Sequence, residues 1–423
     1  MSLSKKKIYL GFFIIYYTIS IFDALFIIYI PLYYLNILSV DRVELSLIQG
    51  LTYLTLLVTP LLGFLYDRYL INEIQSKMIL CLSCIILSIS FLIFIFFKEL
   101  LLLYGIFMII SLFSKSLIRT GMSSLFLNVV KESEDIKLNV ILLVNTATIV
   151  GYLGISLIFN LEVLNINSLR FWNTFFIIGW ILSLPIFIIF GIFANKVQYF
   201  SQTINIQNKS INNLEFKLSR YEFILIGVIY FSSILATSDL LISYPLSSWI
   251  YDKFNETGFR IYSSLYFIFI LCSILGLYLA NFLCKKYREK KVMVIFTYIY
   301  SILLLPITIS NFPMFMIINS ILSVISYVIT VAYTSLITEF SNKGKYRTFK
   351  YQFLQTSSSM ACIFFIPLGT LYFGTITVET LIIISSILIG FSGFFLLSTV
   401  PIDKIIDQKK REIIIEETID VIS

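Results

Sequence analysis

Four ionisable residues stand within long apolar runs of the chain, away from its charged loops. Asp23 lies in the first run and Asp239 in the seventh, whereas Lys115 and Arg119 share the fourth. A charged side chain at the centre of a bilayer costs about 2.5 to 3.5 kcal/mol on insertion scales, so it is expected to face a water-filled cavity or a partner. These four residues therefore indicate an ion or solute pathway inside a membrane.

Tyr16 and Ser20 precede Asp23 by seven and three residues, a spacing that places all three on one face of a helix. The chain contains no histidine, so a proton crossing the membrane would have to travel on a carboxylate. We therefore predict Asp23 and Asp239 to be proton-coupling residues of a central cavity, with Tyr16 and Ser20 beside the first of them. The alternative for Asp23 is an ion pair that only locks helices together.

Lys115 and Arg119 form a stripe with Ser111 and Ser123, because these four residues recur at every fourth position. Like charges at this spacing repel one another and need anions nearby. Two interpretations are open. In the first, the two cations and the two buried aspartates neutralise one another. In the second, the stripe also binds a carboxylate or phosphate of a solute, which the planar guanidinium can contact through two parallel hydrogen bonds.

Several other chemistries lack the residues that they require. Without histidine there can be no Ser-His or Cys-His pair, and the five cysteines and the carboxylates are not clustered as zinc ligands. The Gly-x-x-x-x-Gly-Lys-Ser/Thr loop that binds nucleotide phosphates is also missing. We therefore expect no enzymatic activity, no cofactor and no metal, and we expect transport to be driven by a gradient of ions or solute.

The elements that must position these residues are membrane helices. Apolar residues make up 58% of the 423-residue chain and charged residues only 13%, against about 25% charged residues in soluble domains. A run of about 20 apolar residues is long enough to cross a bilayer core of roughly 30 Å. We predict an all-α polytopic membrane protein with 12 transmembrane helices, at residues 8–35, 45–66, 78–97, 100–129, 138–159, 171–193, 221–249, 261–283, 292–310, 312–337, 349–372 and 380–400.

The net charge of +7 is distributed along one face of the predicted membrane protein. Most Lys and Arg residues fall in the N-terminal segment and in the loops after even-numbered runs, and such basic loops stay in the cytoplasm. We therefore expect a multi-pass protein of the cell membrane with cytoplasmic N- and C-termini. Its expected partners are a small-molecule solute, protons and the lipid bilayer; no nucleic acid is expected, and the protein is expected to be a monomer. The charged turn at 131–137 should be a solvated face.

The second run closes at residues 63–68 with the sequence Gly-Phe-Leu-Tyr-Asp-Arg. It resembles the Gly-x-Leu-x-Asp-Arg signature between helices 2 and 3 of the major facilitator superfamily of secondary transporters. The resemblance implies two six-helix halves and a gating motif made by Gly63, Asp67 and Arg68, in which Asp67 caps the start of helix 11. A carboxylate there would face the positive end of a helix dipole. The loop after the motif departs from the family, since Leu70 replaces its second glycine.

The second half of the chain repeats features of the first. Gly11 precedes Asp23 by twelve residues, and Gly227 precedes Asp239 by the same number. We predict two six-helix pseudo-repeats, with a first bundle at 1–193, a cytoplasmic linker at 194–220, a second bundle at 221–400 and a cytoplasmic tail at 401–423. Two such halves with a substrate site at mid-membrane between them are the architecture of the family that the motif resembles.

Polar side chains also follow single faces of runs 5, 10 and 11, where Asn145, Asn319 and Gln355 stand. Runs 3, 9 and 12 show no comparable face. This division matches the cavity-lining and peripheral helices that the resemblance implies, so the three amides are predicted to line the substrate site together with Lys115 and Arg119.

These features together predict a secondary active transporter that moves a small solute by alternating access and couples to protons through buried aspartates. A proton-independent exchanger or facilitator of an organic anion is the first alternative; in that case all four charges would be binding or structural groups. A membrane scaffold or solute sensor that keeps the fold without transporting is the second alternative.

Overall fold

The computed structural model describes residues 3–69, 73–130, 134–161, 168–188, 220–242, 245–342, 346–372 and 375–398. The predicted linker lies outside these residues except for Arg220, and the predicted tail at 401–423 lies entirely outside them.

The first half of the chain folds into six rods. In three of these rods the α-helical ladder is broken near a proline, which has no backbone N–H: Pro31 follows a π-helical turn, Pro60 follows a 3-10 turn and Pro185 stands in a 3-10 turn. The elements in order are α1 (Leu3–Ala24), η1 (Leu25–Tyr29), α2 (Ile30–Asn36), α3 (Arg42–Tyr53), η2 (Leu54–Val58), α4 (Thr59–Tyr69), α5 (Glu73–Phe97), α6 (Leu101–Val130), α7 (Glu134–Leu161), α8 (Leu169–Ser183) and η4 (Leu184–Phe187).

The second half also folds into six rods. They comprise α12 (Arg220–Ala236), η6 (Ser238–Ile242), α13 (Pro245–Lys286), α14 (Glu289–Leu304), η7 (Leu305–Ile309), α15 (Phe312–Ser341), α16 (Arg347–Tyr372) and α17 (Val378–Ser398). The prediction placed a loop between residues 249 and 261, but α13 is helical throughout that stretch. Pro245 stands in the first turn, where proline is favourable, and no further proline interrupts the helix.

Eleven helical segments of the described chain are long and apolar enough to cross a membrane. The twelfth rod, α16, falls outside that set because its first half carries several polar residues: Lys350, Gln352, Gln355, Thr356, Ser357, Ser358 and Ser359. The predicted all-α polytopic fold is confirmed, and its least apolar rod is the one that packs between other helices.

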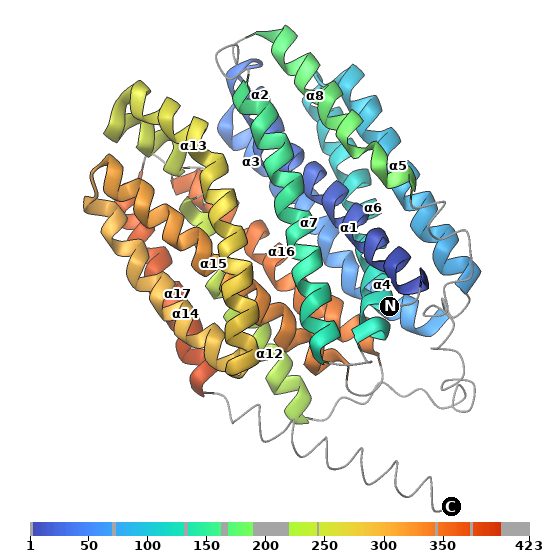
Figure 1. Cartoon of the computed structure of the whole chain (residues 1–423). Helices are drawn as coiled ribbons and strands as arrows, with labels where there is room; N and C mark the ends of the chain where they lie inside the picture. Colours follow the sequence, from blue (N-terminus) through green and yellow to red (C-terminus); the bar gives the residue numbers. More distant parts are fainter. Residues whose placement is uncertain are drawn as a thin grey trace, which may run out of the picture.

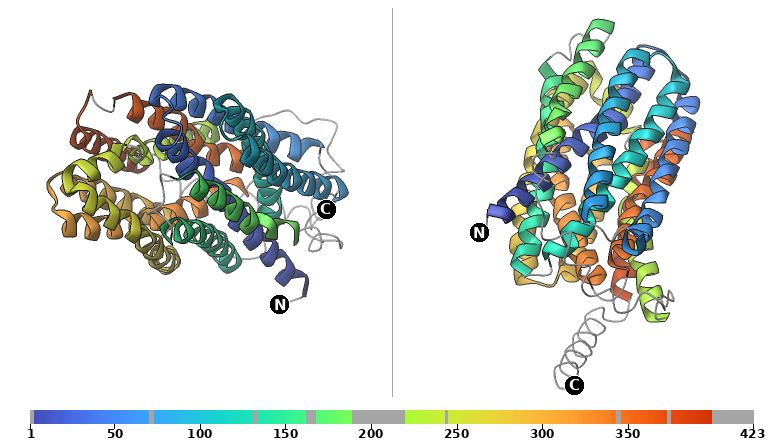
Figure 2. Two further views of the ribbon diagram at one scale, coloured as in Figure 1. Left: turned by 90° about the horizontal axis from the view of Figure 1, so that it is seen from above. Right: turned by 90° about the vertical axis from the view of Figure 1, so that its right-hand side faces the viewer.

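The rods of the two halves lie on opposite sides of the molecule (Figure 1). Seen from above, the yellow and orange helices of the second half face the blue and green helices of the first (Figure 2). Two rods connect the sides: α7 of the first half packs on α13, and α16 of the second half packs on α3, α4 and α6. The residues that face α16 and α7 therefore lie where the two halves meet.

Aromatic packing against α8 holds α2 in place within the first half. The side chains of Tyr33, Trp172 and Phe176 are fully buried. The ring of Tyr33 lies 5.5 Å from that of Trp172 and 5.6 Å from that of Phe176, both edge to face. Such pairs contribute about 0.5 to 1.5 kcal/mol each beyond their buried area. This core fixes the rod whose first part carries Asp23.

Candidate functional site

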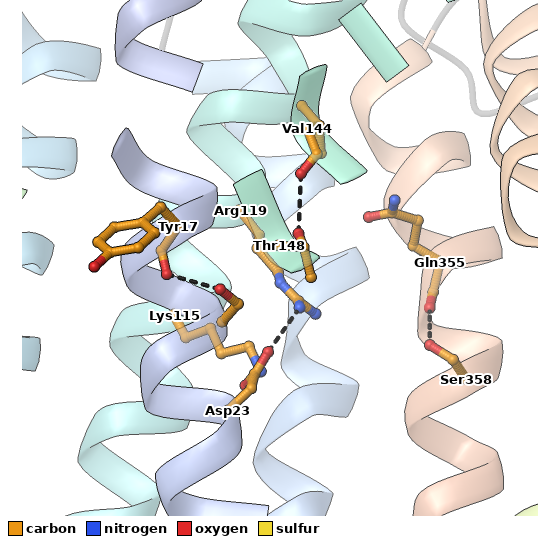
Figure 3. A network of polar contacts seen from close by, with 9 residues as sticks. Tyr17, Asp23, Lys115, Arg119, Val144, Thr148, Gln355 and Ser358 are labelled. Atoms are coloured by element: carbon orange, nitrogen blue, oxygen red, sulfur yellow. Dashed lines mark hydrogen bonds and ion pairs between the residues drawn. The ribbon is translucent and has the colours of Figure 1, made fainter. Parts of the chain in front are cut away.

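Asp23 of α1 forms an ion pair with both cations of the α6 stripe. Its Oδ1 pairs with Lys115 Nζ, and its Oδ2 lies 3.4 Å from Arg119 Nη2. The three side chains point toward one another in Figure 3. The side chain of Lys115 is 7% exposed and that of Asp23 12%, whereas that of Arg119 is 34% exposed. The predicted charges on the first and fourth runs therefore meet, and Arg119 is the most open of the three.

Arg119 lies at the meeting of the two halves and not against lipid. The Gln352 amide of α16 donates hydrogen bonds to the Arg119 carbonyl oxygen at 3.2 Å and to Ser123 Oγ at 2.7 Å. Tyr351 and Cys362, also on α16, lie within electrostatic range of the guanidinium. The guanidinium therefore lies on the surface between the two helix bundles.

Tyr16 and Ser20, which the spacing placed beside Asp23, have separate environments. The Tyr16 side chain is hydrogen-bonded to Ser123 and lies within electrostatic range of Arg119, so it belongs to the cluster. Ser20 instead donates to the carbonyl oxygen of Tyr17 at 2.7 Å. Its Oγ stands where a Cβ added at Gly151 of α7 would overlap it. Ser20 therefore serves the close packing of α1 on α7.

Asp239 accepts its described hydrogen bond within the second half. The Tyr300 hydroxyl of α14 donates to Asp239 Oδ2 at 2.8 Å. The neighbouring Ser238 exchanges hydrogen bonds with Ser385 of α17, which turns η6 toward the outer helices. The mutual neutralisation of two cations by two aspartates is therefore not what the structure shows: both described ion pairs of the stripe go to Asp23.

The three amides predicted to line the site are half-buried on their own helices. Asn145 Nδ2 donates to the Ile141 carbonyl oxygen at 2.8 Å, and Asn319 Nδ2 donates to that of Phe315 at 3.0 Å. Gln355 Nε2 donates to the Tyr351 hydroxyl at 3.0 Å. Of the three, Gln355 is the one tied to a residue near Arg119, and Figure 3 shows it on the helix beside the cluster.

The motif at residues 63–68 contacts the start of α16. Asp67 Oδ2 accepts a hydrogen bond from the backbone N–H of Phe349 at 2.9 Å, as the resemblance implies. A Cβ at Gly63 would lie 3.1 Å from the Phe349 Cα, so this glycine permits close approach of the two helices. The Arg68 guanidinium lies 5.9 Å from the centre of the Phe64 ring, within the range of a cation–π contact.

Two further polar contacts join the halves at the end of the molecule that holds Asp67. Lys137 Nζ of α7 lies 3.0 Å from Glu289 Oε1 of α14, which also accepts from Ser335 at 2.8 Å. Arg347 Nη2 donates to Asn128 Oδ1 at 2.6 Å. We call these contacts, together with the bond from Phe349 to Asp67, the inter-half latch.

The prediction that residues 131–137 form a solvated face was wrong for Lys137, which is only 6% exposed. Its partner Glu289 stands 152 positions away, so no local spacing could have identified the pair. The one signal in the sequence was a lysine in the first turn of an apolar helix. No group of three or more Cys, Asp or Glu residues gathers as a metal site within the described chain.

One family model matches the second half of the chain. Residues 219–414 match the model of the Major Facilitator Superfamily, the family that the motif at residues 63–68 resembles. No curated protein sequence gives a significant match to the chain.

Solved structures share the fold of this chain over both halves. The human organic anion transporter MFSD10 (TETRAN) superposes with a TM-score of 0.65 at 12% identity, over 94% of this chain and 100% of that one. The nucleoside transporter NupG superposes with a TM-score of 0.58 at 13% identity, over 94% of this chain and 100% of that one. A bacterial homologue of the iron transporter ferroportin, in its outward-facing state, superposes with a TM-score of 0.66 at 11% identity, over 94% of this chain and 99% of that one. The superpositions show that the fold is shared. At such low sequence identity they do not extend to the solute.

Proposed function

We propose that this protein is a secondary active transporter of the Major Facilitator Superfamily that moves a small solute by alternating access, with Asp23 as its proton-coupling group. The observation that carries the proposal is the ion-paired cluster of Asp23, Lys115 and Arg119 at the meeting of the two halves. Buried charges are costly in a membrane and are kept where they serve an ion or solute pathway.

The inter-half latch supports a two-state cycle. Its contacts join the two halves at the Asp67 end. These contacts must break before a solute can leave on that side. The excess of Lys and Arg in the loops at this end supports a cytoplasmic location for this end and for both termini. We therefore assign the structure to a state that is closed toward the cytoplasm. We also propose that the protein is a monomer in the cell membrane.

Asp23 is the carboxylate best placed to couple a proton to this cycle. Lys115 and Arg119 face it from α6, while Tyr53 of α3 and Cys362 of α16 lie within its electrostatic range. A proton on Asp23 would release both cations of the stripe. The same stretch of α6 bonds to Gln352 of α16, so the change reaches a helix of the other half.

The test is uptake by purified protein in proteoliposomes with an imposed pH gradient. Because the structural neighbours include an organic anion transporter, a nucleoside transporter and a homologue of an iron transporter, the labelled solutes should include organic acids, nucleosides, sugars and iron. We expect accumulation of at least one solute to follow the gradient, and Asp23→Asn to lose that dependence. An Asp23→Asn protein that keeps both rate and pH dependence would exclude the residue as the coupling acid.

Two other results would identify the alternatives. Counterflow by the unaltered protein at the same rate with and without a pH gradient would indicate a proton-independent exchanger or facilitator. Ligand binding without any flux would indicate a scaffold or sensor.

A further inference from the structure

The cluster at the meeting of the halves carries one unbalanced positive charge. Lys115 and Arg119 contribute two cations, and Asp23 is the one anion paired with them in the described chain. Asp239 lies within electrostatic range of Cys362, as the cluster does, but it is hydrogen-bonded to Tyr300 and forms no ion pair with either cation among the described residues. The Lys115 side chain is almost fully buried against Asp23, whereas Arg119 has a single contact of 3.4 Å and a side chain that is 34% exposed. The surplus charge is therefore carried mainly by Arg119.

A second observation comes from Tyr53 on α3. The residue is 2% exposed, and its hydroxyl has no hydrogen-bond partner among the described residues. It lies within electrostatic range of Asp23 and of Cys362 on α16. A buried hydroxyl without a partner costs about 1 to 3 kcal/mol, which makes it a donor available to a ligand. Cys362 also lies within range of Arg119, so the buried hydroxyl and the partly exposed cation have Asp23 and Cys362 as common neighbours.

These two observations restrict the chemistry of the solute. A cationic solute would meet a cluster of its own sign, and a neutral solute would leave the Arg119 charge unbalanced in a medium of low dielectric constant. A carboxylate or phosphate can take two parallel hydrogen bonds from the guanidinium and accept another from a tyrosine hydroxyl.

We infer that the transported solute is an organic anion whose carboxylate or phosphate binds Arg119, with the Tyr53 hydroxyl as a second donor. This inference rests on the proposed transport function and specifies its substrate class. A singly charged anion would bring the cluster to neutrality, so the loaded protein would change conformation without moving a net charge in this region.

The experiment compares acids with their neutral counterparts. Thermal shifts of the detergent-solubilised full-length protein would be measured with benzoate and benzamide, lactate and lactamide, succinate and succinamide, phenyl phosphate and phenol, and inorganic phosphate. A bound ligand stabilises the folded protein by mass action. We expect at least one acid to stabilise the protein at millimolar concentration and its neutral counterpart not to do so. The carboxylate and phosphate arms show which group is preferred.

Variants then test the assigned donors. Arg119→Gln should lower the affinity for the acid about 10- to 100-fold, since a hydrogen bond to a charged group is worth about 1.5 to 3 kcal/mol. Arg119→Lys, which keeps the charge without the two-pronged geometry, should fall between. Tyr53→Phe should lower the affinity about 2- to 10-fold. Arg170→Gln is the matched control, because Arg170 is exposed at the start of α8, far along the chain from the cluster.

The outcomes separate this inference from the proposed function. The inference is overturned if no acid stabilises the protein, if the amides bind as well as the acids, or if Arg119→Gln binds the acid like the unaltered protein. Uptake of the labelled hit into proteoliposomes is then measured. A neutral solute carried with flux would leave transport standing and remove the inference. An acid that binds through Arg119 but is not transported would support the inference and contradict the proposed transport function.

Discussion

The backbone N–H of Phe349 donates to Asp67 Oδ2 at 2.9 Å, joining two residues 282 positions apart in the chain. Asp67 thus supplies a negative charge and an acceptor to the first turn of α16, where unpaired N–H groups and the helix dipole favour both. The Thr348 hydroxyl and backbone also bond to this carboxylate. The contact connects the end of α4 in one half to the start of the helix that packs between the halves.

Replacing Asp67 should weaken the closed state at this end. We expect Asp67→Ala to cost about 1 to 2 kcal/mol, because it removes the cap and the charge together. Asp67→Asn keeps an acceptor and should cost about half as much. The measurement is the distance distribution between spin labels at Lys7→Cys and Lys286→Cys, exposed sites of opposite halves at this end, in a background without native cysteines. Glu44→Gln, at the exposed start of α3, is the control.

Gly63 should not tolerate a side chain in this state. A Cβ there would lie 3.1 Å from the Phe349 Cα and from the Thr348 carbonyl oxygen, and neither backbone atom can move without shifting α16. We expect Gly63→Ala to destabilise the closed state by about 1 to 3 kcal/mol and to lengthen the spin-label distance. Gly154→Ala is the matched control, because no atom lies within 4 Å of the added Cβ. Equal behaviour of the two variants would refute the close approach.

The ion pair of Lys137 and Glu289 should show strong non-additivity. Removing one partner of a buried pair leaves the other charge uncompensated, at a cost of about 3 to 5 kcal/mol. Lys137→Met or Glu289→Met alone should therefore open the Asp67 end in the spin-label assay. The double substitution should recover most of the closed population, because two apolar side chains leave no unpaired charge. Additive effects of the two single substitutions would contradict a direct pair.

Asp23 should matter to stability as well as to transport. Asp23→Asn leaves Lys115 buried beside Arg119 without its anion, and like charges at this spacing repel. We expect a loss of about 3 to 5 kcal/mol, seen as a lower midpoint of thermal unfolding. Adding Lys115→Met should restore most of it. Arg119→Gln in the unaltered background should cost less than about 1 kcal/mol, because its side chain is one-third exposed. A cost for Arg119→Gln as large as that for Asp23→Asn would place Arg119 deeper than the structure does.

The sequence alone determined the rods and the residues that had to find partners. Apolar run lengths are matched to the bilayer thickness, which is a local property, so the all-α membrane fold could be predicted. The four-residue spacing placed Lys115 and Arg119 on one face, and the cost of a buried charge identified Asp23 as a residue requiring a partner. The motif at residues 63–68 predicted the contact between Asp67 and the start of α16 through family resemblance.

Tertiary structure decided which rods face one another and how each is turned about its axis. In the folded protein Asp239 is hydrogen-bonded to Tyr300, and Ser20 packs against Gly151. Lys137 pairs with Glu289, and α13 begins at Pro245. Spacing along one helix defines a face but not the neighbour that the face meets. That neighbour depends on packing among helices distant in the chain, and this is why the partners of the polar residues had to be read from the fold.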